Sequence, residues 1–178
     1  MMAKSLDSLE KTLDRGLGVA EVLFQHVATA ILAIMLFINS VNIFLRTAID
    51  FSFAWVWPWT MVLFVWFSFL SLYLLYRQRR DVSISVMIDR LGAGGRLVLG
   101  LIIHTIVLSS AVVLVLTIPE LIEKRKGYIE IVGLPRYVLT LPFLASSVLV
   151  IFDALHNILA LLIGKKTFIA YGAIGSDL

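Results

Sequence analysis

Three side chains in the second half of the sequence have the chemistry for proton transfer or metal binding: Asp153, His156 and His104. Asp153 and His156 are three residues apart, with Asn157 next to them, so all three share one helical face. Each lies in a long apolar stretch, where an ionised carboxylate is costly unless a neighbour shares its charge or proton. We therefore expect one buried polar cluster. A hydrogen-bonded lock between helices is favoured over a proton relay or a haem site, because three polar groups do not make a pathway.

No other catalytic pattern accompanies these residues. The chain contains no cysteine, which excludes disulfides, thiol nucleophiles and cysteine-ligated metal clusters. It also lacks the GxSxG, HExxH and phosphate-loop signatures of common hydrolases, metalloproteases and nucleotide-binding proteins. We therefore expect no enzymatic activity, no bound cofactor and no catalytic, substrate or metal site in this chain.

The composition is typical of a membrane protein. Sixty per cent of the 178 residues are hydrophobic and 15% are charged, against about 25% charged in a soluble domain, and the mean hydropathy is +0.98. Because the apolar runs are apolar on every side, helices are expected rather than the alternating strands of a barrel. The sequence predicts an all-α membrane protein with one integral membrane domain over residues 1–178. The four expected spans cover about residues 22–45, 52–76, 97–119 and 137–164.

The distribution of basic residues predicts the orientation. Most Lys and Arg residues precede the first span, connect the second to the third, or follow the fourth. Positive residues are retained on the cytoplasmic side, so both termini are expected in the cytoplasm. Aromatic residues would then mark the two membrane interfaces, the outer one with Trp55, Trp57 and Trp59 and the inner one with Tyr73 and Tyr76.

The first 17 residues predict an amphipathic helix that lies in the cytoplasmic interface. Leu9, Leu13 and Leu17 recur on one helical side, with Lys11 and Asp14 on the other. Two glycines, at positions 16 and 18, would allow a turn into the first span. A second, weakly amphipathic segment is expected over residues 81–91.

Polar and small residues within the spans predict helix contacts. Asn39 and Asn42 need hydrogen-bond partners in lipid, and Arg46 would extend to the outer interface. The pairs at residues 109–110 and 146–147 are serines, which let helices approach closely.

The outer connection between the third and fourth spans has its own signals. Glu120 and Lys124 are four residues apart and predict an ion pair on a helix that continues beyond the membrane. Pro135 or Pro142 is suited to the first turn of the fourth helix.

Several motifs follow one another in a defined order along these spans. They are Asn42-Ile-Phe-Leu-Arg46, Leu63-Phe-Val-Trp66-Phe-Ser-Phe-Leu70, Asp81-Val-Ser-Ile84, Val132-Gly-Leu-Pro135-Arg-Tyr137 and Leu141-Pro142. Their order, their spacing and the four-span topology resemble the small membrane subunit, of DctQ type, of tripartite ATP-independent periplasmic (TRAP) transporters. The resemblance extends from about residue 41 to residue 162.

The resemblance implies a function and a set of partners. A periplasmic substrate-binding protein would capture an organic acid outside the bacterial inner membrane. A large multispan membrane subunit would then move it inward by sodium-coupled symport, through an elevator-like motion. The small subunit would hold the stationary scaffold of that large subunit without binding substrate. Sodium is therefore expected in the large subunit, membrane lipid surrounds both subunits, and nucleic acid is not a partner.

This interpretation assigns candidate contacts to particular residues. The candidates for helix packing or for the large subunit are Asn42, Arg46, Trp55, Trp59, Trp66, His104, Pro135, Pro142, Asp153 and His156. The candidates for the receptor are Lys124, Arg125 and Lys126. Two alternatives remain open from the residues alone. One is a redox membrane anchor with haem between the two histidines, and the other is a small channel or transporter that acts alone.

Overall fold

The structure, a computed structural model, describes the backbone of residues 2–78, 93–124 and 126–162. It consists of α1 (Met2–Ile49), α2 (Val56–Gln78), α4 (Ala93–Lys124), a 3-10 helix η1 (Arg136–Thr140) and α5 (Leu141–Leu162). Over these ranges the only strand-like pairing is an isolated bridge between Tyr128 and Pro135. Four helices are long and apolar enough to cross a membrane. The predicted all-α membrane fold with four transmembrane helices is therefore confirmed.

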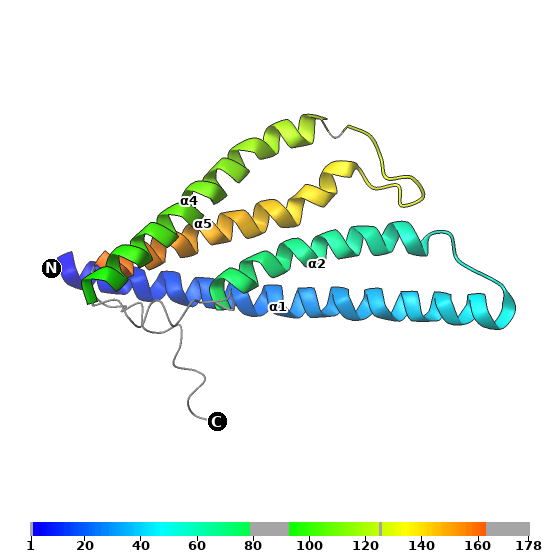
Figure 1. The fold of residues 1–178 in the computed structure, drawn as a ribbon, viewed down its shortest axis with the longest axis horizontal. Helices are drawn as coiled ribbons and strands as arrows, with labels where there is room; N and C mark the ends of the chain where they lie inside the picture. The colour runs from blue at the N-terminus through cyan, green and yellow to red at the C-terminus, as the bar shows by residue number, and fades with distance from the viewer. Residues whose placement is uncertain (1, 79–92, 125, 163–178) are drawn as a thin grey trace, which may run out of the picture.

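The helices form two antiparallel hairpins (Figure 1). One pairs α1 with α2, the other pairs α4 with α5, and the hairpins meet along α2 and α5. They lie close together at the end of the molecule near the N-terminus and separate towards the loops that follow α1 and α4. As a result α2 and α5 are central, whereas α1 and α4 each leave a broad surface uncovered by the rest of the chain.

Helix α1 is longer than the sequence predicted. It runs unbroken through Gly16 and Gly18, so the expected turn between an N-terminal helix and the first span is wrong. Glycine costs only about 1 kcal/mol in a helix, and contacts with α2 offset that cost on both sides of these positions. The Leu17 carbonyl accepts a hydrogen bond from the Tyr73 hydroxyl at 3.0 Å. The interfacial location of residues 1–17 stays a prediction.

The first hairpin is fastened by polar groups near its turn. The Asn39 amide donates to the Thr60 hydroxyl at 2.8 Å and thereby links α1 to α2. The Asn42 side-chain oxygen accepts a hydrogen bond from the backbone N–H of Phe53 at 2.8 Å, within the turn itself. Asn39 therefore joins the two helices, and Asn42 holds the turn between them.

The second interface, between α2 and α5, depends on small residues. Ser146 and Ser147 are buried, and the Ser146 hydroxyl donates to the Phe69 carbonyl oxygen. The close approach predicted for this serine pair is therefore confirmed. The pair at residues 109–110 is exposed, and Ser109 bonds to the carbonyl of Ile106 in its own helix, so this pair makes no helix contact within the described chain.

The loop between α4 and η1 is compact over residues 126–135. The backbone N–H of Ile129 donates to the Leu134 carbonyl at 2.8 Å, around a glycine with a φ of 72° at position 133. Lys124 forms the predicted ion pair with Glu120 at 2.6 Å. Pro135 precedes the first residue of η1, and Pro142 lies in the first turn of α5, as expected.

Some predictions lie outside the described residues. These are the receptor candidate Arg125, the amphipathic segment over residues 81–91, and the basic residues Arg79, Arg80, Arg90, Lys165 and Lys166.

Candidate functional site

The most polar site of the described chain is centred on Arg77, in the last turn of α2. Its guanidinium donates from Nη1 to Asp153 Oδ1 at 2.7 Å and from Nε to Glu21 Oε2 at 3.1 Å. Nη2 donates to Asp14 Oδ1 at 3.2 Å. We call these four residues the charge cluster; it joins α1, α2 and α5.

Burial within the charge cluster is graded. The side chain of Asp153 is 4% exposed and that of Arg77 is 14% exposed, whereas Glu21 is 26% and Asp14 is 57% exposed. A guanidinium has five donors in a rigid fork, so it can bind several carboxylates at once where an ammonium could not hold the same geometry. The pair of Arg77 with Asp153 is therefore the buried centre of the charge cluster, and the two α1 carboxylates lie at its edge.

Two tyrosines of α2 surround the charge cluster. Tyr73 is fully buried, and its ring packs edge-on against Phe24 of α1 with a centroid separation of 5.5 Å. Tyr76 is hydrogen-bonded through its hydroxyl to His104 Nδ1 of α4 at 2.9 Å. Tyr73 is therefore a buried packing residue rather than an exposed member of an aromatic belt. The position of Tyr76 at the inner interface stays a prediction.

Asp153 has a different partner from those considered in the sequence. His104, His156 and Asn157 are all buried, as expected for a polar cluster, but the carboxylate of Asp153 is held by Arg77. Arg77 follows the second apolar run, where a basic residue is expected to belong to the connection between the second and third spans. It lies one turn after Tyr73, however, and from there its long stem can reach back towards the bundle.

The chemistry of this arrangement is that of a structural lock. Charge-assisted hydrogen bonds of 2.7 to 3.2 Å occupy the guanidinium on three sides. Among the residues that the structure describes, no group of three or more His, Cys, Asp or Glu is arranged to hold a metal ion. His104, one of the two haem ligands considered above, is bonded to Tyr76 through Nδ1.

The remaining candidates lie away from the charge cluster. Trp55 immediately precedes α2 and is 41% exposed, and Trp59, in the first turn of α2, is half-buried. Trp66 packs against the apolar contact that Ala28 and Ile31 of α1 make with α2. Arg46 lies exposed in the last turn of α1. These residues therefore belong to the first hairpin or to its turn, and the structure does not gather them into one site.

The receptor candidates lie at the end of α4 and in the connection between α4 and η1. Lys124 and Lys126 are exposed, and Lys124 is already paired with Glu120. Glu123 and Glu130 are also exposed on this segment, so its surface charge is mixed.

Residues 34–164 match the protein family described as "Tripartite ATP-independent periplasmic transporters, DctQ component". The chain belongs to the DctQ family. The match covers more than half of the chain and includes Arg77 and Asp153, whereas Asp14 and Glu21 precede it. No match was found among curated proteins or solved structures. The DctQ membership confirms the resemblance seen in the order of motifs and identifies a multi-pass subunit of a TRAP transporter.

Proposed function

We propose that this DctQ subunit braces the large membrane subunit of a sodium-coupled TRAP transporter for organic acids, and that it neither binds substrate nor catalyses a reaction. In this proposal both termini lie in the cytoplasm, and the complex resides in the bacterial inner membrane. Sodium and substrate bind in the large subunit, so the small subunit needs no cofactor. A periplasmic substrate-binding protein delivers the organic acid to the outer face of the complex.

The observation that carries this proposal is how the polar groups inside the spans are used. Arg77 bonds to Asp153, Asn39 bonds to Thr60, and the Ser146 hydroxyl bonds to a carbonyl of α2. Each bond joins two helices of this chain, and interhelical hydrogen bonds of this kind hold membrane bundles together. An elevator needs a stationary frame against which one domain slides, and a cross-linked bundle supplies such a frame.

Reconstitution in vesicles tests the proposal. The complete system, with receptor, large subunit and this chain, is expected to take up organic acid when a sodium gradient is imposed. This chain alone is expected to transport nothing, and it should co-purify with the large subunit. Transport or ion conduction by the isolated chain would contradict the proposal.

The substitution Asp153→Asn distinguishes a structural role of this carboxylate from a role in the transport pathway. The Arg77–Asp153 ion pair would be weakened, so we expect a lower melting temperature of the detergent-solubilised complex. Uptake per assembled complex should stay at the wild-type rate, because no proton or ion passes through Asp153. Uptake abolished in a fully assembled Asp153→Asn complex would instead assign the carboxylate to a transport pathway.

Charge reversal in the outer connection tests the proposed receptor contact. Replacing Lys124, Arg125 and Lys126 together by Glu should slow uptake at low salt by about threefold to tenfold, because charges at the rim of an interface chiefly alter the rate of association. The same variant at high salt is the control, since screening should remove the difference. Unchanged uptake and unchanged receptor binding at low salt would show that the receptor docks elsewhere.

A further inference from the structure

The exposed surface of α1 has two faces of different chemistry. Ala28 and Ile31 of α1 point towards α2 and are buried. A row of exposed residues lies on one flank of this buried face, and we call it the polar stripe. Its members are four, four, three and four residues apart, the spacing that places side chains on one side of a helix. The polar stripe consists of Gln25, Thr29, Ala33, Leu36 and Ser40.

The other flank of α1 is purely apolar. Val27, Ile34 and Val41 recur there every seven residues and are 39%, 53% and 38% exposed. We call these three residues the apolar stripe. At 100° per residue, Ile34 lies about 140° around the helix from Thr29, so the two stripes face different surroundings.

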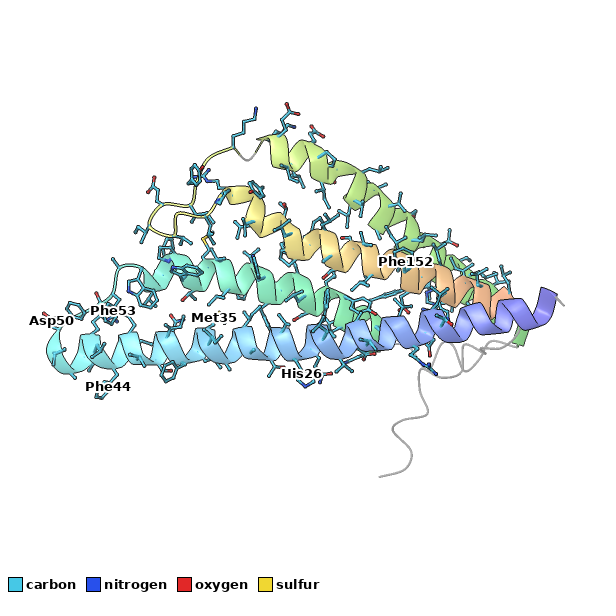
Figure 2. All side chains as sticks on the ribbon, turned by 180° about the vertical axis from the view of Figure 1, so that it is seen from behind. His26, Met35, Phe44, Asp50, Phe53 and Phe152 are labelled. Carbon is cyan, nitrogen blue, oxygen red and sulfur yellow. The ribbon has the colours of Figure 1, made fainter. Side chains whose placement is uncertain are left out.

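Lipid is a poor neighbour for the polar stripe. Gln25 is one helical turn beyond Glu21, and Thr29 is two turns beyond it, so both lie deeper in the span than the charge cluster. A primary amide has two donors and an acceptor, none of which hydrocarbon can satisfy. His26 lies beside Gln25; it points away from α2 (Figure 2), and its Nδ1–H donates to the Val22 carbonyl at 2.7 Å. A protein surface that offers hydrogen bonds fits this face better than acyl chains do.

The small residues of the polar stripe point to the same kind of neighbour. Thr29 and Ala33 are small and one turn apart, whereas Leu36, which is 57% exposed, lies between them and Ser40. Small residues at such spacing let the backbone of a second transmembrane helix approach closely, which is how helices associate where hydrophobicity gives no driving force.

The other peripheral helix, α4, has a different surface. The exposed polar side chains of its span over residues 97–119 are all hydroxyls, of which Ser109 donates to Ile106 and Thr117 donates to Leu114. Large apolar side chains such as Val113 and Leu116 project between them and are 59% and 73% exposed. The exposed side of the α4 span therefore carries hydroxyls but no amide, and the exposed amide of Gln25 makes α1 the better candidate for contact with a protein partner.

We propose that the polar stripe of α1 is the surface on which transmembrane helices of the large TRAP subunit pack. This assignment rests on the proposed function, which supplies the one partner that lies in the same membrane. The matching surface of that partner would be a helix with small residues and with a hydrogen-bonding side chain opposite Gln25. The apolar stripe of α1 would face lipid.

Site-specific photo-crosslinking in the assembled complex tests the assignment. A photoreactive amino acid is placed at Thr29 or Ser40, and the matched controls carry it at Val27 or Ile34 on the same helix. We expect an adduct with the large subunit from Thr29 and Ser40, and loss of that adduct in both controls. Adducts with the large subunit mainly from Val27 and Ile34 would overturn the assignment, as would adducts between two copies of this chain from Thr29.

A second measurement examines the hydrogen bond itself. Gln25→Leu should weaken binding of the large subunit about tenfold, equivalent to about 1.4 kcal/mol and in the range of one interhelical hydrogen bond. Ile34→Leu, on the apolar stripe, is the matched control and should leave binding unchanged. Equal affinity of the Gln25→Leu and wild-type subunits would overturn the role of Gln25. If the wild-type chain does not co-purify with a large subunit at all, the proposed function itself fails. That result is obtained before either the crosslinking or the binding measurement is made.

Discussion

Replacing Arg77 by leucine is expected to destabilise the folded subunit by about 3 to 5 kcal/mol, the usual cost of removing one partner of a buried ion pair. Asp153 would remain, with a side chain only 4% exposed and without its guanidinium partner at 2.7 Å. The hydrogen bonds that the Arg77 guanidinium makes to α1 and to α5 would be lost at the same time. Thermal melting of the purified subunit in detergent or nanodiscs measures the effect.

Two further variants separate the ion pair from simple packing. Arg77→Lys keeps the charge but loses the fork of donors, so it should be destabilised less than the leucine variant. The double variant with Arg77→Leu and Asp153→Leu removes both charges, and it should recover part of the lost stability because no carboxylate is left unpaired. A leucine variant at Arg77 that melts like the wild type would show that the charge cluster does not hold the three helices together.

The substitution Tyr73→Ala is expected to cost about 3 kcal/mol or more, as large-to-small changes at aromatic core positions usually do. Tyr73 is completely buried where α2 meets the other helices, and it packs with Ala111 of α4, Val150 of α5 and Phe24 of α1. Removal of the ring leaves a cavity that the surrounding helices can close only in part. Melting of the subunit in detergent, or the yield of assembled complex, measures the loss.

The conservative variant Tyr73→Phe isolates the hydroxyl. It removes only the 3.0 Å hydrogen bond to the Leu17 carbonyl, so the expected cost is about 1 kcal/mol. Because the Leu17 carbonyl loses its link to α2, this variant should also increase hydrogen exchange of the backbone around residue 17. If both substitutions at this position had the same small effect, the ring would not be part of the packed core.

The sequence predicted the four spans because their signal is local. A run of more than 20 residues without a charge must be helical in lipid, whatever its neighbours are. The roles of Asn39 and Ser146 were also predictable, since an amide or a small residue inside a span has few uses besides helix contact. The partners of these residues were not predictable, because choosing Thr60 or the Phe69 carbonyl requires the register between helices.

The charge cluster illustrates why the candidate site was predicted only in part. Burial of Asp153 and His104 followed from their positions inside apolar runs, and both are buried. The partner of Asp153, however, lies 76 residues earlier in the chain, at the end of a span where a basic residue is usually assigned to the interface. The continuity of α1 through Gly16 and Gly18 was missed for a related reason, since tertiary contacts outweighed a weak local preference.

The length of α1 has a mechanical consequence. At 1.5 Å per residue, its 48 residues measure about 72 Å, more than twice the roughly 30 Å thickness of the hydrocarbon layer. Such a rod must either lean strongly or extend well outside the bilayer. The contacts of α1 with the rest of the chain extend from Asp14, which is bonded to Arg77, to Asn42, which is bonded to Phe53. A change in the tilt of α1 would therefore move α2 with it.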